Sequence, residues 1–246
     1  MDLIEATLLG LIVGVSGTIT GGLLILYRFD NNLTKQSWLL GFSGGIMVAV
    51  VLFDLWPEAY HYGGVFSTVV GSAVGMALVK YFDSVLRLIP WYRKRTFTKS
   101  ARVGILLGMG IGAHNFPEGV ALGTTFIANQ AISNWLGLAL LMALHNVPEG
   151  MIMSSAFKIG KVGLWKIITA LVLVEIPMAF GGTVGAFLGR ISPFMIAASL
   201  GFAGGAMALL VLKELLPMAK KLSGFFWVGS GFAVGILAGV VLIRVT

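Results

Sequence analysis

Two nearly identical motifs place metal-ligating residue types deep inside apolar stretches of the sequence. His114–Gly119 reads HNFPEG and His145–Gly150 reads HNVPEG. In a helix, residues three or four positions apart lie on one side, so each motif would present its histidine, asparagine and glutamate together. These nitrogen and oxygen ligands suit Zn²⁺, Fe²⁺, Mn²⁺ or Co²⁺, and the absence of cysteine argues against a Cu(I) site. Because ionisable groups at this depth are costly, the motifs predict a functional metal site.

A third carboxylate extends this candidate site. Glu175 lies near the middle of another apolar stretch and is followed closely by Pro177. Pro117 and Pro148 each remove a backbone donor, which is expected to loosen or kink the helix beside the ligands and free a carbonyl group. A single buried histidine often only joins two helices by a hydrogen bond, but two motif copies use two of the chain's three histidines. The candidate ligands are His114, Asn115, Glu118, His145, Asn146, Glu149 and Glu175.

The elements that must carry these residues are transmembrane helices. Hydrophobic residues make up 57% of the chain and charged residues 11%, and the mean hydropathy is +0.95. Backbone groups in lipid must be satisfied within the segment, so apolar runs of roughly 20 residues are expected to be helical. We therefore predict an all-α integral membrane protein with one transmembrane domain over 1–246. Its eight predicted spans are 3–27, 38–59, 64–86, 101–127, 133–157, 163–188, 192–216 and 225–244.

The distribution of basic residues predicts the orientation of these spans. Lysine and arginine gather in the first, third, fifth and seventh connections, whereas the even connections carry only Arg190. Odd connections are therefore expected in the cytoplasm and both termini outside. The sequence pI near 9.8 reflects these loops rather than nucleic-acid binding. Asp2 and Glu5 precede the first span in place of a basic region, so this helix is expected to be retained rather than cleaved as a signal peptide.

An internal repeat relates the two halves of the chain. Gly41–Met47 reads GFSGGIM and leads to Pro57, while Gly201–Met207 reads GFAGGAM and leads to Pro217. The second span thus echoes the seventh, and the fourth echoes the fifth. Each pair is separated by an odd number of crossings, which predicts an inverted repeat arranged as 3+2+3 helices, an architecture common among transporters. Spans 1 to 3 and 6 to 8 are then expected to rock against the central pair.

The whole chain resembles the ZIP (Zrt/Irt-like protein) transporters and, among them, the bacterial ZupT-like branch, in which HNxPEG occurs in the fourth and fifth helices. The resemblance also covers the eight spans, the Glu175–Pro177 element and the repeat of the second and seventh spans. It implies uptake of divalent metal ions into the cytoplasm by a homodimer in the bacterial inner membrane. The expected cargo is Zn²⁺, with Fe²⁺, Mn²⁺, Co²⁺ and Cd²⁺ as further ions, and no separate cofactor or enzymatic activity is expected.

The resemblance further implies a central site for two metal ions. His114, Glu118, His145 and Glu149 would form the transport site. Asn115, Asn146 and Glu175 would form the second site, with the two motif glutamates bridging the ions. Some relatives have Gln-Asp where this chain has His145-Asn146, so the second site here is one negative charge short of theirs. The histidine-rich cytoplasmic loop of many eukaryotic members is also missing, because residues 87–100 are basic and lack histidine.

Polar residues at the predicted span ends suggest a pathway. Asp54, Glu58 and His61 fall at the outer end of the second span and would collect metal, while Glu214 falls at the inner end of the seventh and would release it. The alternative is that these four residues are ordinary polar residues at the membrane interface, with no role in transport. Two other function classes stay open: an intramembrane metalloenzyme, although HNxPE differs from the HExxH of zinc proteases, and a metal-gated channel.

Overall fold

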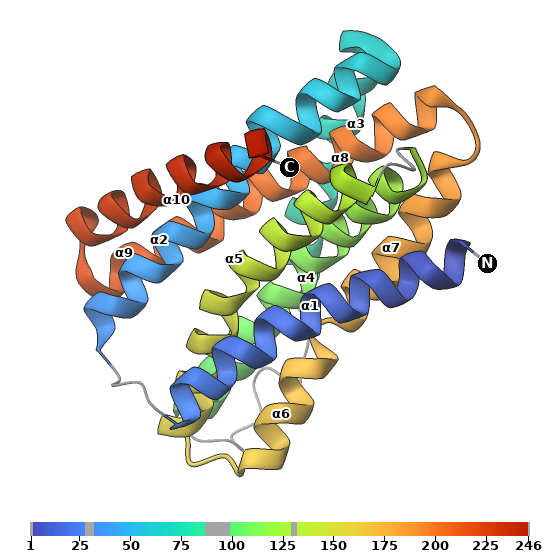
Figure 1. Cartoon of the computed structure of the whole chain (residues 1–246). Helices are drawn as coiled ribbons and strands as arrows, with labels where there is room; N and C mark the ends of the chain where they lie inside the picture. Colours follow the sequence, from blue (N-terminus) through green and yellow to red (C-terminus); the bar gives the residue numbers. More distant parts are fainter. Residues whose placement is uncertain (1, 28–31, 87–98, 129–131, 246) are drawn as a thin grey trace.

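A computed structural model describes residues 2–27, 32–86, 99–128 and 132–245, and every regular element in these ranges is a helix (Figure 1). The basic residues Arg28, Arg87, Arg93, Lys94 and Arg95 of the predicted cytoplasmic connections lie outside this part of the chain. The helices are α1 Asp2–Tyr27, α2 Leu33–Val50, the π-helix η1 Val51–Leu55, α3 Trp56–Leu86, α4 Lys99–Ala128, α5 Ile132–Ile159, α6 Leu164–Leu173, α7 Ile176–Gly189, α8 Pro193–Leu210, the π-helix η3 Val211–Leu215, α9 Leu216–Ser223 and α10 Phe225–Val245.

Six helical segments of the described chain are long and apolar enough to cross a membrane. This finding confirms an all-helical membrane protein. The predicted span 38–59 and most of the span 64–86 fall within one of these segments, which is 49 residues long. Helix α4, which carries the first motif, is not among the six. The six segments are Leu3–Tyr27, Leu33–Tyr81, Trp135–Ile159, Leu164–Gly189, Pro193–Ser223 and Phe225–Arg244.

The 49-residue segment is interrupted at Gly64. This residue has φ 69° and ψ −173°, a non-helical conformation that glycine adopts without the steric cost of a side chain. Gly64 lies at the predicted start of the third span. Figure 1 shows the chain folding back within the cyan part of this segment. The later part of α3 then packs along α8.

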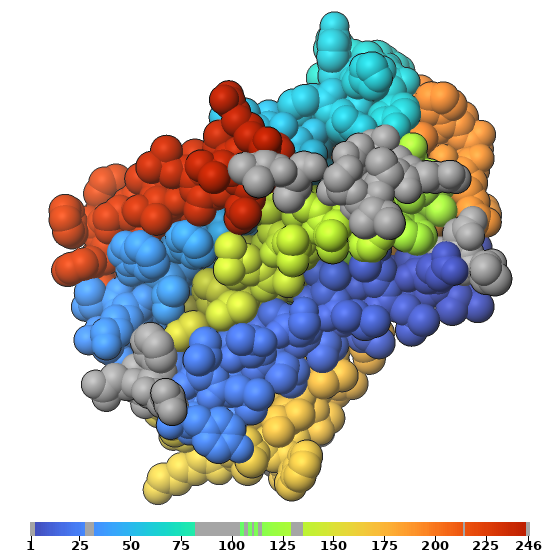
Figure 2. Space-filling model, viewed as in Figure 1, coloured from blue at the N-terminus to red at the C-terminus, as the bar shows by residue number. Residues whose placement is uncertain are grey.

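The helices pack as two groups. The first consists of α1, α4, α5, α6 and α7, where α4 packs on α7 and α1 packs on both α5 and α7. The second consists of α2, η1, α3, α8, η3, α9 and α10, where α3 packs on α8 and α2 packs on α10. Figure 2 shows α1 (blue) lying along α5 (yellow-green) on one face of the molecule. This grouping differs from the predicted one, because α1, α6 and α7 lie with the motif helices rather than with the outer helices.

The two copies of the internal repeat share an uncommon local structure. After the GFSGGIM segment, α2 continues into η1, and after the GFAGGAM segment, α8 continues into η3. Each π-helix ends two residues before a proline, Pro57 or Pro217, which has no backbone N–H to donate. A π-helix widens the hydrogen-bonding register by one residue and makes room for the proline ring without ending the helix. The similarity between the second and seventh predicted spans therefore extends to their backbone.

Candidate metal site

The two motifs lie inside continuous helices, the first in α4 and the second in α5, with Pro117 and Pro148 in the helix interiors. Their described polar side chains are removed from the surface: Asn115, Glu118, His145 and Asn146 are 0% exposed and Glu149 is 1% exposed. The side chain of His114 lies outside the part that the structure describes. Charged and polar groups buried at this depth need partners or an ion to offset their desolvation.

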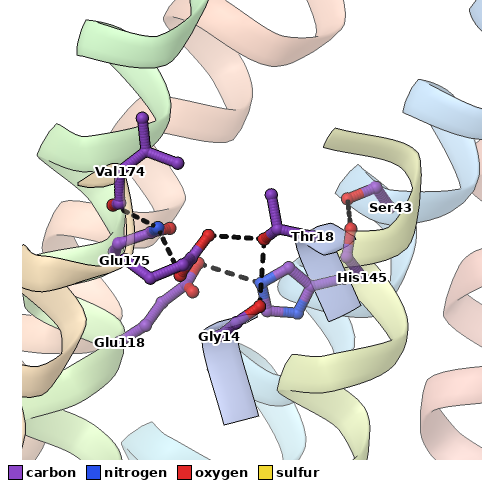
Figure 3. Close-up of polar contacts among 8 residues, drawn as sticks. Gly14, Thr18, Ser43, Glu118, His145, Val174 and Glu175 are labelled. Carbon is purple, nitrogen blue, oxygen red and sulfur yellow. Dashed lines mark hydrogen bonds and ion pairs between the residues drawn. The ribbon is translucent and has the colours of Figure 1, made fainter. Parts of the chain in front are cut away.

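Glu118 and His145 join the two motif copies directly. The Oε1 atom of Glu118 lies 3.0 Å from the Nε2 atom of His145, and both side chains are fully buried (Figure 3). The contact links α4 to α5, so a carboxylate from one copy meets an imidazole from the other. This is the kind of pair that can bind a borderline divalent cation.

Glu175 occupies a break between two helices. α6 ends at Leu173 and α7 begins at Ile176, where Pro177 stands in the first turn and its missing N–H costs no helical hydrogen bond. The sequence predicted one uninterrupted span here. The Glu175 side chain does not cap α7 but points into the protein core, where it is 0% exposed.

Asn115 connects Glu175 to the first motif. Its Nδ2 group donates to Oε2 of Glu175 at 2.8 Å and to the backbone carbonyl of Val174 at 2.9 Å (Figure 3). The break before α7 thus supplies both a carboxylate and a carbonyl to the same asparagine. Through this contact the third carboxylate predicted from the sequence lies beside the first motif.

Several buried polar atoms of the candidate ligands have no hydrogen-bond partner within the described chain. These are Oδ1 of Asn115, Oε2 of Glu118, and both Nδ2 and Oδ1 of Asn146. Buried polar atoms without partners are rare and costly, so each is a candidate contact for an ion or a water molecule. Among the described side chains, no three of histidine, aspartate and glutamate gather closely enough to hold a metal ion. The described ligands are therefore arranged as pairs rather than as a closed coordination shell.

Two residues that the sequence analysis did not single out contact the candidate ligands. Thr18 of α1 donates its hydroxyl to Oε1 of Glu175, and Ser43 of α2 donates to the backbone carbonyl of His145 at 3.0 Å (Figure 3). Ser43 lies within the repeated GFSGGIM segment, and this repeat could have marked it as a candidate in the sequence. Alanine replaces it in the second copy. Thr18 had no comparable signal beyond its place in a glycine-rich stretch.

The predicted pathway residues lie on the second packing group. Asp54 in η1 and Glu58 in α3 are half-buried, and His61 is exposed and packs edge to face on Tyr62 with ring centroids 5.8 Å apart. The side chain of Glu214 lies outside the described part of the chain.

Comparison with known proteins gives relatives along most of the chain. Zinc transporter ZupT of Escherichia coli O7:K1 is 30% identical over 234 residues, which cover 88% of this chain and 83% of the relative. Zinc transporter ZupT of Shigella dysenteriae serotype 1 is 29% identical over 233 residues with the same coverage. An Arabidopsis thaliana protein whose name proposes zinc transport is 30% identical over 189 residues, although these span only 29% of its length. No protein-family model matches the chain.

The relatives confirm the resemblance seen in the motifs. The match to the E. coli transporter extends over most of both proteins, and the helical segments of the structure are suited to crossing a membrane several times. The relatives are named as transporters, which bears out the expectation of a transport protein rather than an enzyme. The chain therefore belongs to the ZIP family of metal transporters, in its ZupT-like branch, and is a multi-pass protein of the plasma membrane.

Proposed function

We propose that this protein carries zinc into the cytoplasm, with Fe²⁺, Mn²⁺, Co²⁺ and Cd²⁺ as further cargo. The observation that carries the proposal is the burial of Glu118, His145, Asn146, Glu149 and Glu175 among apolar helices. Within the described chain, Oε2 of Glu118 and the carboxamide of Asn146 also have no hydrogen-bond partner. Carboxylates buried in this way are costly alone but offset the charge of a dication. The relatives named as zinc transporters support zinc as the principal ion.

The site is proposed to hold two ions. His114, Glu118, His145 and Glu149 bind the transported ion, while Asn115, Asn146 and Glu175 bind a second, with Glu118 and Glu149 shared. The contacts between Glu118 and His145 and between Asn115 and Glu175 support this division, because each joins two members of one proposed set. The ions are cargo, so the ligands must release as well as bind them.

The topology is proposed to be eight crossings in one 1–246 domain, arranged as a 3+2+3 inverted repeat with both termini outside. Two features support it. The matching π-helices η1 and η3 occur in the second and seventh predicted spans. The packing is also symmetric, because the repeat equates span 1 with 6, 2 with 7, 3 with 8 and 4 with 5. It relates the contact of α3 with α8 (spans 3 and 7) to that of α10 with α2 (spans 8 and 2). It likewise relates the contact of α4 with α7 (spans 4 and 6) to that of α5 with α1 (spans 5 and 1).

Alternating access is proposed to arise from movement between the two packing groups. The contacts within each group exceed those between them, which run chiefly through α4–α8 and α2–α5. All proposed ligands belong to the first group, and the proposed collecting residues Asp54, Glu58 and His61 and the releasing residue Glu214 belong to the second. A homodimer is proposed from family membership.

Transport by purified protein in liposomes tests the function. An inward zinc gradient should give saturable ⁶⁵Zn uptake that liposomes without protein lack. The same assay at low zinc tests the proposed collecting residues through the variants Asp54→Ala and Glu58→Ala. Linear, non-saturating flux would instead indicate a metal-gated channel. Tight zinc binding without any flux would contradict transport.

Asn146→Asp is expected to strengthen binding of the second ion. Asn146 is fully buried, and neither atom of its carboxamide has a partner within the described chain. An added carboxylate restores the negative charge that the second site lacks, and charge pairs are strongest where water is excluded. Calorimetric titration with zinc should give a higher occupancy or at least about tenfold tighter binding for the second ion. Unchanged occupancy and affinity would place Asn146 outside the site.

A further inference from the structure

The hydroxyl group of Thr18 is buried and has two hydrogen-bond acceptors within reach. Its side chain is 0% exposed on α1, a helix to which the sequence assigned no ligand. The Oγ1 atom lies 3.0 Å from the carbonyl oxygen of Gly14, one turn earlier, and also donates to Oε1 of Glu175 (Figure 3). A threonine hydroxyl has a single hydrogen, so it can serve only one of these acceptors at a time.

The backbone of α1 is shaped to seat the Glu175 carboxylate beside Thr18. A Cβ atom at Gly14 would lie 2.1 Å from Oε2 of Glu175, so the carboxylate rests against bare backbone at this position. One turn further along α1, the carbonyl oxygen of Thr18 would lie 2.0 Å from a Cβ atom placed on Gly150 of α5. The carboxylate is thus enclosed by α1, and α1 is itself fixed against the second motif.

We propose that Thr18 is a positioning residue that holds Glu175 while the metal site is empty and releases it when an ion binds. The inference rests on the proposed role of Glu175 as a ligand. The hydroxyl donates to Oε1 of Glu175, while Asn115 donates to Oε2, so both carboxylate oxygens have protein donors. When an ion takes Oε1, the hydroxyl turns to the carbonyl of Gly14, which is already within reach. The buried Thr18 hydroxyl therefore has an acceptor in either state.

Thr18 therefore competes with the metal for Glu175. Removing the hydroxyl withdraws a hydrogen bond to a charged group from the empty state, but only the weaker hydrogen bond to the neutral Gly14 carbonyl from the loaded state. The empty state becomes less stable, so zinc is expected to bind about tenfold or more tightly to Thr18→Val than to the wild type. The KM for zinc uptake should fall, and the maximal rate should fall with it, because release must re-form the empty site.

The variants can be chosen to separate this role from packing. Thr18→Val keeps the branched shape, Thr18→Ala also lacks the hydroxyl and avoids any overpacking by valine, and Thr18→Ser restores the hydroxyl. Thr7→Val is the matched control, because Thr7 also lies on α1, donates to the carbonyl one turn earlier at 2.6 Å, and contacts a residue of α7, but that partner is the Thr183 hydroxyl at 2.6 Å. A role in packing alone would give Thr7→Val and Thr18→Val similar effects.

The experiment is zinc titration by calorimetry on the purified full chain, together with initial uptake rates in liposomes. The expected result is tighter binding and a lower KM for Thr18→Val and Thr18→Ala, with wild-type values for Thr18→Ser and Thr7→Val. In a Glu175→Ala background, Thr18→Val should change zinc affinity less than about twofold, since the coupled partner is gone. Unchanged or weaker binding by Thr18→Val, with Glu175→Ala still impaired, overturns the inference about Thr18 alone. Unchanged zinc binding by Glu175→Ala overturns the proposed ligand set.

Discussion

Glu118→Gln is expected to abolish zinc uptake while leaving the protein folded in the membrane. Glu118 is fully buried and meets His145 at 3.0 Å, so its charge acts in a region that excludes water. A dication entering this region loses its hydration, and the carboxylate supplies the compensating negative charge. Glutamine keeps the shape and can still contact His145, but it carries no charge. We expect uptake to fall by about 100-fold or more, a larger effect than the loss of a supporting contact around a metal.

The matched control for this variant is Glu5→Gln, which makes the same chemical change at an exposed position of α1. Both proteins should elute from size-exclusion chromatography as the wild type does, and Glu5→Gln should transport zinc at the wild-type rate. Wild-type uptake by Glu118→Gln would remove the carboxylate from the transport site. An equal loss in both variants would point to a general effect of charge on insertion.

Local sequence patterns were sufficient to predict the parts of the site that depend on helix geometry. The spacing within the motifs predicted that Asn115 and Glu118 project from one helix, and both side chains are buried and bonded to candidate ligands from other helices. Glu175 was found from its position in an apolar stretch. The helical geometry and the burial can be predicted in this way because, in lipid, hydrogen bonding within the segment leaves helix as the available structure and burial of a carboxylate needs a specific reason.

Tertiary packing decided the features that the sequence did not reveal. The break between α6 and α7 places Glu175 at a helix end, although the run 163–188 reads as continuous. Pro117 and Pro148 suggested weakened helices, yet α4 and α5 continue through both. The contact of Thr18 with Glu175 joins residues 157 positions apart, and a lone threonine gives no local sign of it. The grouping of α1 with α5 likewise depends on surfaces that only the folded chain brings together.

The final glycine of each motif has a packing role that can be tested separately from metal binding. A Cβ atom on Gly150 would lie 2.0 Å from the carbonyl oxygen of Thr18 in α1, and one on Gly119 would lie 2.0 Å from the carbonyl oxygen of Met178 in α7. Both obstacles are backbone atoms, which cannot rotate away as a side chain can. Small residues at such positions let membrane helices approach closely. The same motif position thus joins α5 to α1 and α4 to α7.

Gly150→Ala is therefore expected to destabilise the protein, although alanine is the better helix former. Helix propensity favours alanine over glycine by about 1 kcal/mol. Against this, forcing a methyl group into a filled contact costs about 1–3 kcal/mol, and here α1 and α5 must move apart. The net cost is up to about 2 kcal/mol, so we expect the midpoint of thermal unfolding in detergent to fall by up to about 8 °C.

Gly229→Ala provides the control of opposite sign. Gly229 lies within α10, and a Cβ atom there would meet only a ring atom of Phe225 at 3.9 Å, an ordinary contact. The higher helix propensity of alanine then meets no packing cost, so this variant should unfold at the same temperature as the wild type or slightly above it. A Gly150→Ala protein as stable as Gly229→Ala would contradict the close approach of α1 and α5. Destabilisation of Gly150→Ala alone would assign the glycine of HNVPEG to the contact that holds α1, and with it Thr18, against the helix of the second motif.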